Sequence, residues 1–310
     1  MKFIKAVPMA ACGLALALAA LGNLLLPLPH GQIIRYICGV LSFAVLVVFA
    51  LKIMFDFPHA KEELKTPVPL SVLPAATMAI MLLCTYIRPY AGYVALGIWY
   101  AALVLHVCLM LLFIKRFCFG FKLAAVFPSW FIVGVGLVAA SVTAPAMGAI
   151  VIGQIAFYVG LVLYFAILPL VVLRMNKVRI FPEPARKTVA IFTAPMSLLV
   201  VGYFSSFVSQ GQGNETLIYV MLSIAAISYV YVSIMMFSLL KIKFYPTYAG
   251  FTFPYVISAI AFRLGANFLA ARHGLDFLIT IADATMWIAV FAVGFVLLHY
   301  IRYFRFWLKF

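Results

Sequence analysis

The 310-residue chain is 67% hydrophobic and only 9% charged, with a mean hydropathy of +1.20 and a formal net charge of +15. Soluble domains carry roughly 25% charged residues, so this composition excludes a soluble globular enzyme, a disordered chain and a nucleic-acid-binding domain. The long, continuous apolar runs predict an all-α polytopic membrane protein, because a β-barrel would show short segments of alternating polarity instead.

Ten apolar runs are long enough to cross a bilayer, which takes roughly 20 residues per helix. We expect spans over 8–27, 33–55, 68–88, 92–115, 128–144, 148–174, 187–208, 216–241, 247–271 and 276–301. The first run follows Lys2 and Lys5 and therefore also has the pattern of a cleavable signal peptide. We interpret it as a span because its length and its place in the repeat described below fit one.

The positions of Lys and Arg predict the orientation, because cytoplasmic loops are rich in these residues. With ten spans and both termini in the cytoplasm, eighteen of the 22 basic residues fall on the cytoplasmic side. The other side keeps Arg35, Arg88, Arg263 and Arg272. The pattern predicts a multi-pass protein of the cytoplasmic (inner) membrane, and it explains the net charge by topology and contact with anionic lipid.

Prolines recur in or at the start of the odd-numbered spans, about 60 residues apart: Pro8, Pro74, Pro128, Pro195 and Pro254. Self-similarity at a fixed period indicates repeats of one supersecondary unit. We therefore expect a single transmembrane domain over 1–310 that is built from five helical hairpins. Their approximate bounds are 1–60, 61–120, 121–180, 181–243 and 244–310.

A proline removes one backbone hydrogen bond and bends a helix. Because a freed carbonyl is tolerated at membrane depth only against protein or water, the odd helices are expected inside and the even helices outside. Kinks are expected at Pro74, Pro195 and Pro254. The odd spans also contain small residues that permit close packing, namely Gly13, Gly22, Gly134, Gly136 and Gly202. Such a ring leaves a central path, or packs as a solid bundle with kinks.

Three segments resemble the tellurite-resistance/dicarboxylate transporter family: VPMAACGLALALAALG (7–22), FPEPARKTVAIFTAPMSLLVVGY (181–203) and YAGFTFPYVISAIAF (248–262). That family includes TehA-type bacterial proteins, malate permeases and the plant slow anion channels. The resemblance extends over essentially the whole chain. It implies a quasi-five-fold ring of five hairpins around a central pore, often as a homotrimer with one pore in each subunit.

The resemblance also implies a site. In the family an aromatic ring on the ninth span plugs the pore, and the string Phe251-Thr252-Phe253-Pro254 matches its context. Phe253 is therefore the expected gate, with Gly13 and Leu198 as its expected neighbours in the pore lining. Span five lacks the polar Asn-Phe-Thr type of pattern, and span one has Ala15 in place of a second proline. These departures concern pore polarity and substrate preference.

Few ionisable residues lie within the spans. In a hairpin that turns near Gly274, Arg263 lies opposite position 285, so an intramembrane ion pair between Arg263 and Asp283 is expected. We favour a structural role for this pair, and the alternative is an anion-attracting mouth or a proton-coupling carboxylate. His106 and His299, on outer helices, are interpreted as packing residues rather than proton relays.

Four carboxylates outside the spans are interpreted as ordinary loop residues. Asp56, Glu62 and Glu63 are expected to be solvated, and Glu183 is expected to pair locally with the basic residues around it. The five cysteines form no CxxC pair, and no GxSxG, HExxH or phosphate-binding glycine loop is present. We therefore expect no catalytic residues, no cofactor, no metal and no enzyme activity.

The expected function is an anion channel or channel-like transporter that passes small anions such as chloride and nitrate through a pore gated by Phe253. Its expected partners are small anions, membrane lipid and further copies of itself, with no nucleic acid. The alternative is a secondary carrier for C4-dicarboxylates such as malate, or for sulfite or tellurite. A carrier needs a saturable midplane site, at Arg263 or at the hydroxyls of Ser197, Ser205 and Ser206. A third candidate is a structural subunit with a solid core.

Overall fold

The computed structural model describes residues 6–178, 187–239 and 245–308, and all regular structure within these ranges is helical. Eight helices in the described ranges are long and apolar enough to cross a membrane. The chain is therefore a multi-pass helical membrane protein, as its composition predicts. Lys2, Lys5 and Glu183, which are named above, lie outside the described ranges. So do five further basic residues of the eighteen counted on the cytoplasmic side, namely Arg179, Arg186, Lys241, Lys243 and Lys309.

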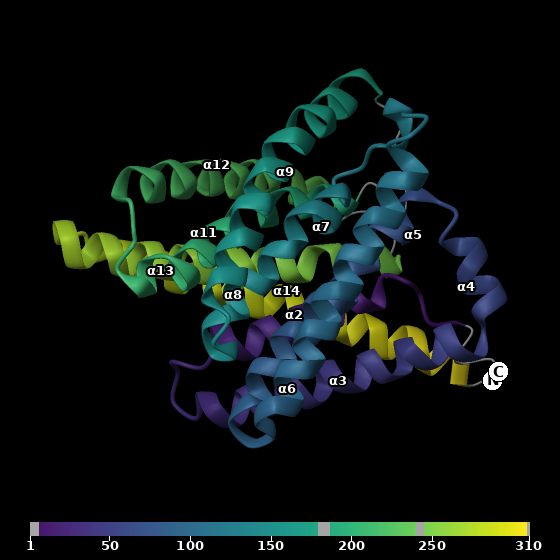
Figure 1. The fold of residues 1–310 in the computed structure, drawn as a ribbon, viewed down its shortest axis with the longest axis horizontal. Helices are drawn as coiled ribbons and strands as arrows, with labels where there is room; N and C mark the ends of the chain where they lie inside the picture. Colours follow the sequence, from purple (N-terminus) through teal and green to yellow (C-terminus); the bar gives the residue numbers. More distant parts are fainter. Residues whose placement is uncertain (1–5, 179–186, 240–244, 309–310) are drawn as a thin grey trace.

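The helices follow one another as antiparallel neighbours (Figure 1). The first part of the chain contains α2 (Ala11–Leu24), α3 (Gly31–Phe55), the short α4 (Phe57–Glu63) and α5 (Pro67–Val72), and α6 (Pro74–Phe117). The middle contains η1 (Leu123–Ala125), α7 (Trp130–Gly134), η2 (Val135–Leu137), α8 (Val138–Met147) and α9 (Ile150–Lys177). The last part contains η3 (Lys187–Thr193), α11 (Ala194–Ser206), η4 (Val208–Gln210), α12 (Glu215–Leu239), η5 (Pro246–Phe251), α13 (Thr252–His273) and α14 (Phe277–Leu308).

The longest helix, α6, reverses direction at a single residue. Gly92 has φ 36° and ψ −113°, a conformation that is not helical and that a side chain at this position would disfavour. The turn that we expect between residues 88 and 92 is therefore made at a single glycine. The helix before this turn continues through Pro89. The count of ten spans stays a prediction, since it requires α6 to be counted twice and the 14-residue α2 to be included.

Five helical segments form a closed inner ring. In ring order they are α2, the first half of α6, the α7–η2–α8 segment, α11 and α13, and each packs against the next until α13 meets α2 again. Specific contacts hold the joints. The Tyr86 hydroxyl of α6 donates to the Ala19 carbonyl of α2 at 2.5 Å. Ser141 and Ser206 join α8 to α11 at 3.0 Å, and Ser197 and Ser258 join α11 to α13 at 2.9 Å.

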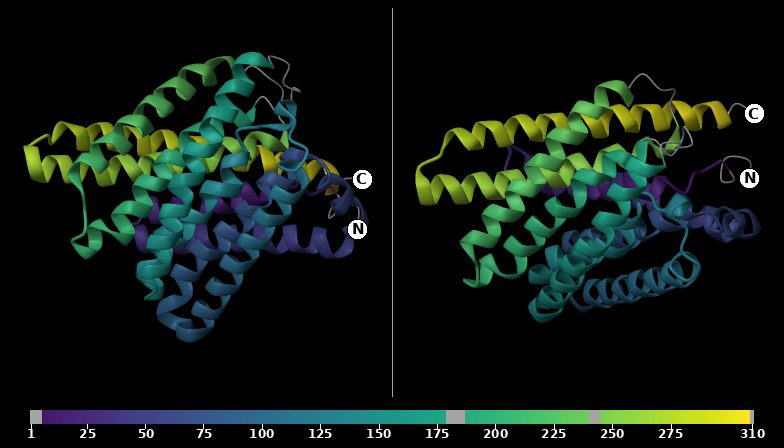
Figure 2. Two further views of the ribbon diagram at one scale, coloured as in Figure 1. Left: turned by 45° about the horizontal axis from the view of Figure 1, so that its top comes forward. Right: turned by 90° about the horizontal axis from the view of Figure 1, so that it is seen from above.

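The remaining long segments, α3, the second half of α6, α9, α12 and α14, cover this ring from outside, and Figure 2 shows them from two further directions. The difference in burial is large. In the most apolar stretch of Trp130–Met147 and of Thr188–Gln210, 78% of the residues are buried, compared with 28% in Ile150–Lys177. The expected division into inner odd helices and outer even helices is therefore correct for these segments.

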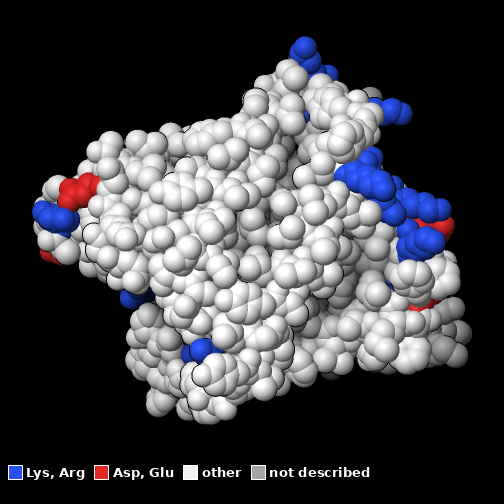
Figure 3. All heavy atoms as spheres, in the orientation of Figure 1, with Lys and Arg blue, Asp and Glu red and all other residues white. Residues whose placement is uncertain are grey.

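The two ends of the molecule differ in charge. Lys and Arg gather at the end where α4 lies, which we call the α4 end, and a smaller mixed group marks the tip of the α13–α14 hairpin (Figure 3). The broad face between them is almost free of charge, as a lipid-facing belt requires. The start of α2 and the end of α14 meet at the α4 end, where the Tyr303 hydroxyl donates to the Ala6 carbonyl at 3.3 Å.

The repeated prolines mark where each regular inner helix begins. Pro74 is the first residue of α6, and Pro195 and Pro254 lie in the first turns of α11 and α13. On the N-terminal side of these residues the backbone is the separate helix α5 or a 3₁₀ segment, η3 or η5. The N–H groups in the first turn of a helix have no acceptor within the helix, so a proline there costs no hydrogen bond. The prolines therefore start regular helices at the α4 end instead of bending them in their middle.

Glycine permits the closest approach within the ring. Val138 of α8 packs between Gly160 of α9 and Gly202 of α11, and a Cβ atom built on either glycine would overlap it. At Gly202 that Cβ would lie 2.5 Å from Val138 Cγ1 and 3.1 Å from Ser141 Oγ. The α8–α11 joint therefore depends on the absence of a side chain at this position.

We expect Gly202→Ala to destabilise the protein by about 1–3 kcal/mol, because it overpacks a tight helix joint. Gly294→Ala in α14 is the matched control, since a Cβ atom there meets no atom within 4 Å. The free energy of unfolding in detergent micelles, measured for both variants, checks this. Equal stability of the two variants would contradict the packing argument.

Candidate functional site

A cavity of about 250 Å³ lies on the inner side of the ring at its α4 end. All five inner segments contribute to its wall, together with α5, η3 and η5. The volume has room for several water molecules. The centre of the ring is thus hollow at this level. A structural subunit with a solid core, the third candidate function, would have no such cavity.

The cavity ends at a similar depth on every inner helix. The deepest lining residues are Leu16 of α2, Met78 of α6, Gly136 of η2, Leu198 of α11 and Pro254 of α13. Each lies within about two turns of the start of its inner segment. No described residue in the C-terminal half of an inner helix lines the cavity. The cavity is therefore a vestibule at one end of the ring.

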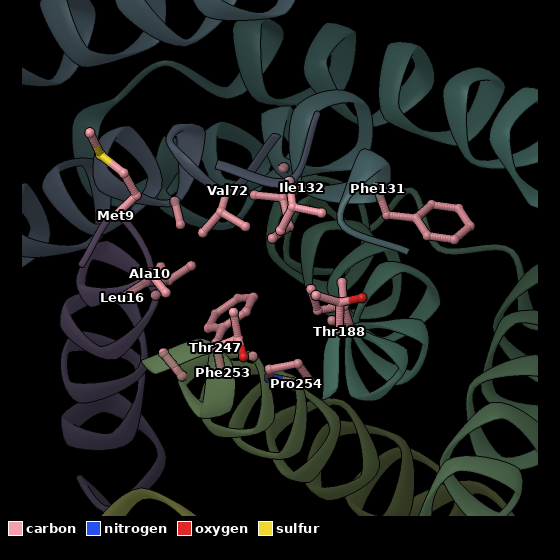
Figure 4. Close-up of a pocket in the computed structure, with 18 of the residues that line it drawn as sticks. Met9, Ala10, Leu16, Val72, Phe131, Ile132, Thr188, Thr247, Phe253 and Pro254 are labelled. Atoms are coloured by element: carbon pink, nitrogen blue, oxygen red, sulfur yellow. The ribbon is translucent and has the colours of Figure 1, made fainter. Parts of the chain in front are cut away.

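The expected gate and its expected neighbours line this one cavity. Phe253 projects from α13 toward the interior, with Val72 and Ile132 on the opposite side (Figure 4). Gly13 and Leu198 are also in the wall. A Cβ atom built on Gly13 would lie 3.6 Å from Ala249 Cβ, so that α2 and η5 are already in contact there. Phe253 is 8% exposed, which places its ring at the boundary between cavity and packed core.

Two of the three expected kink residues, Pro195 and Pro254, belong to the wall, and Ala75 lies there next to Pro74. The inner helices begin around the cavity, so their N-terminal ends surround it. A helix N-terminus carries about half a positive charge. The N-terminal ends of the inner helices therefore contribute a positive potential to the vestibule, although Pro74, Pro195 and Pro254 each lack one N–H donor near it.

Glu63 is the sole ionisable side chain among the described residues that line the cavity. Its Oε1 atom lies 2.6 Å from Nζ of Lys52, whose side chain is 2% exposed. Glu63 itself is partly open to the cavity, with its side chain 34% exposed, so that the expectation of solvation is wrong for Asp56 alone. Asp56 is 7% exposed, and its Oδ2 atom has no hydrogen-bond partner in the described part of the chain. Glu62 is exposed as expected, and a hydrogen bond from Lys65 lowers the pKa of its carboxyl group.

A family model described as voltage-dependent anion channel matches residues 4–301, almost the entire chain. The chain belongs to this family. No curated protein matches it. The family model and the polytopic helical fold agree with the resemblance found in the sequence, and they make an anion channel or transporter the functional class of this membrane protein.

In this member of the anion channel family, side chains compensate the backbone breaks around the vestibule. The Cys12 thiol lies 3.3 Å from the Val72 carbonyl between α5 and α6. His106 Nε2 lies 3.2 Å from the Val133 carbonyl, where α7 passes into η2. The Ser197 hydroxyl donates to the Thr193 carbonyl at 2.9 Å, where η3 passes into α11. Carbonyl groups left by the irregular backbone thus have partners inside the protein, as a membrane interior requires.

The hydroxyl groups considered for a carrier site do not line the cavity. Ser197 is paired with Ser258, and Ser206 donates to the Ser141 carbonyl at 2.7 Å; all four serines are fully buried. These hydroxyls connect neighbouring inner helices. Ser205 is not among the lining residues either.

The Arg263–Asp283 pair joins α13 to α14. Arg263 Nη1 lies 2.6 Å from Asp283 Oδ1, and the two side chains are 25% and 42% exposed. Neither residue lines the cavity.

His106 is fully buried and bonds at both ring nitrogens, with Nδ1 2.8 Å from the Thr77 hydroxyl. Within the described ranges, no three His, Cys, Asp or Glu residues come together as metal ligands.

The Lys52–Glu63 contact was missed from the sequence, although one signal for it exists. Lys52 lies three residues before the end of the apolar run 33–55. A lysine buried there needs an anionic partner, because an unpaired buried charge is costly. Three carboxylates in the following loop and helix, those of Asp56, Glu62 and Glu63, supply candidates, but the choice of Glu63 depends on how α4 folds back along α3.

We expect His106→Leu to cost about 1–3 kcal/mol of stability, because it leaves the buried Val133 carbonyl without its side-chain partner. His106→Gln keeps an N–H donor of similar reach and should retain part of that stability. Thermal unfolding of both variants in detergent checks this, and a leucine variant as stable as the glutamine variant would argue against the role.

Proposed function

We propose that the protein conducts small monovalent anions, such as chloride and nitrate, along the axis of the inner ring, and that Phe253 closes this path. The α4 end faces the cytoplasm in this proposal, and the protein lies in the cytoplasmic membrane, with three copies assembling as the resemblance implies. The observation that carries the proposal is the position of Phe253. Its ring lies in the wall at the depth where the vestibule ends, and the wall also contains Gly13 and Leu198.

One ring is sufficient to close such a path. A narrow apolar constriction excludes water, and an ion without water at membrane depth meets a high barrier. The vestibule wall consists mainly of aliphatic and small residues, so closure requires little more than a bulky apolar group across its deep end. Phe253 precedes Pro254 at the start of α13, where the backbone changes from 3₁₀ to α-helical geometry. A small change at this junction moves the ring.

Anion preference follows from the field at the α4 end. The helix N-termini around the vestibule favour negative charge, and Lys and Arg gather on the surface nearby (Figure 3). Such a field raises the local concentration of anions without a dedicated binding residue.

The wall favours a channel over a carrier. A carrier needs a site that holds its substrate at the midplane, and a dicarboxylate would call for unpaired cationic groups. Among the described lining residues no Lys or Arg is present. Weak, diffuse attraction suits conduction, because an ion that binds weakly also leaves rapidly.

We expect Phe253→Ala to raise anion current about tenfold or more, since lowering a barrier by about 1.4 kcal/mol already gives a factor of ten. Voltage-clamp recordings in chloride and in nitrate baths measure it. Phe262→Ala is the matched control on the same helix, because the Phe262 ring packs against Tyr229 of α12 with centroids 5.2 Å apart and is not part of the cavity wall.

Two outcomes decide against the proposal. Equal currents in the two variants would make Phe253 a packing residue. Silence of all proteins in voltage clamp, combined with proton-dependent malate uptake into vesicles, would establish the carrier instead.

A further inference from the structure

A buried lysine lies directly behind the cavity wall. Lys52 is near the C-terminal end of α3 and 1% exposed, and the other residues from Phe43 to Phe55 are all apolar. Its Nζ atom lies 2.6 Å from Glu63 Oε1, at the last residue of α4. A buried ion pair adds little stability compared with apolar residues of the same size, because both ions lose their hydration. Its presence here therefore calls for another explanation than stability.

Glu63 faces the vestibule and Lys52 does not. The carboxylate is in the cavity wall with its side chain 34% exposed, whereas Lys52 is absent from the wall. A carboxylate without a partner would repel every anion that enters, by an interaction that falls off only slowly within the low-dielectric walls. Lys52 cancels this repulsion from a position that anions do not reach.

The backbone around Glu63 is held in place. Ala60 of α4 is 1% exposed, the Thr66 hydroxyl donates to the Glu63 carbonyl at 2.7 Å, and Arg116 Nη1 donates to the Leu64 carbonyl at 3.1 Å. Glu63 is therefore fixed between Lys52 and the opening of the cavity. A paired carboxylate at this point keeps a polar, hydrated rim on a vestibule whose other walls are apolar, without adding net charge.

A second ion pair in the same chain segment provides a comparison. Lys65 Nζ also lies 2.6 Å from a carboxylate oxygen, that of Glu62, but these side chains are 59% and 66% exposed and neither residue lines the cavity. The two pairs share chemistry, distance and chain segment. They differ in burial and in access to the vestibule.

We propose that the Lys52–Glu63 pair is a specificity-determining element of the vestibule, in which Lys52 neutralises the one wall carboxylate and so keeps the entrance permeable to anions. Lys52 is a positioning residue, since it acts through Glu63. This inference rests on the proposed function, because it assigns a role within anion conduction.

The test uses the full-length protein with Phe253→Ala as the conducting parent, in excised patches that expose the α4 end to the bath. Lys52→Gln should reduce the current of anions entering from that end by about two- to fivefold at 0.1 M salt. The opposite direction of current should change less. At 1 M salt the Debye length falls to about 3 Å and the reduction should largely disappear.

Three further variants separate charge from structure. Glu63→Gln should raise the same current, because it leaves Lys52 uncompensated. The double variant with Lys52→Gln and Glu63→Gln should return to the parent, since it restores neutrality and keeps two polar side chains. Lys65→Gln removes the same charge from the exposed pair and should change the current far less than Lys52→Gln. Size-exclusion profiles show whether each variant is folded.

The outcomes are distinct. If Lys52→Gln reduces current equally in both directions and at both salt concentrations, or if it behaves like Lys65→Gln, the pair is structural and the inference is overturned while conduction stands. If the parent passes no anion current, the proposed function fails first and the inference falls with it. Direction-dependent, salt-sensitive effects of opposite sign in the two single variants support the role assigned to the pair.

Discussion

The structure depends on one requirement of the membrane interior, that every backbone carbonyl and N–H group finds a partner within the protein. The inner segments do not begin as simple helices: α5, η2, η3 and η5 interrupt or precede them near the vestibule. The interruptions free carbonyl groups, and polar side chains compensate several of them, Cys12 and His106 from a neighbouring helix and Ser197 from the same helix. Cys12, His106 and Ser197 therefore have structural tasks, and the polar groups of the inner ring are largely used before any ion is considered.

The same interruptions create the vestibule. A regular helix of ordinary side chains would fill the ring axis, whereas 3₁₀ segments and prolines move the backbone at the α4 end and leave space there. Beyond the first two turns the helices are regular and the ring is closely packed, with α8 held against both α9 and α11 at glycine positions. Irregular backbone and open space coincide, and Phe253 stands at the border between the open and the packed halves.

Much of the fold could be predicted from the sequence because hydrophobic length and proline period are local properties. The prolines and small residues of the odd spans separate inner from outer helices, and that distinction agrees with the burial of Trp130–Met147, Thr188–Gln210 and Ile150–Lys177. A turn between 88 and 92 was expected, but its form, a reversal at the single residue Gly92, could not be predicted, since the local sequence does not distinguish it from a longer loop. The burial of Asp56 and the pairing of Glu63 with Lys52 could not be predicted either, because both depend on α4 lying against α3. Prolines were expected to kink helices, but their missing N–H groups are best tolerated where helices start.

Under the proposed function, a protein with fifteen net positive charges conducts its anion without a cationic side chain in the described wall of the vestibule, and the arrangement gives a physical reason for this. A lysine or arginine in the vestibule wall would bind an anion tightly in the low dielectric there and would slow its release. The described wall contains no such residue, and its one carboxylate is paired with a lysine behind it. What remains is the diffuse field of helix ends and surface charge, which attracts anions from a distance and holds none of them strongly. Such a field discriminates by sign and poorly by chemical identity. Under the proposed function, any preference among anions therefore has to arise at the proposed constriction at Phe253, from the size and hydration of the ion.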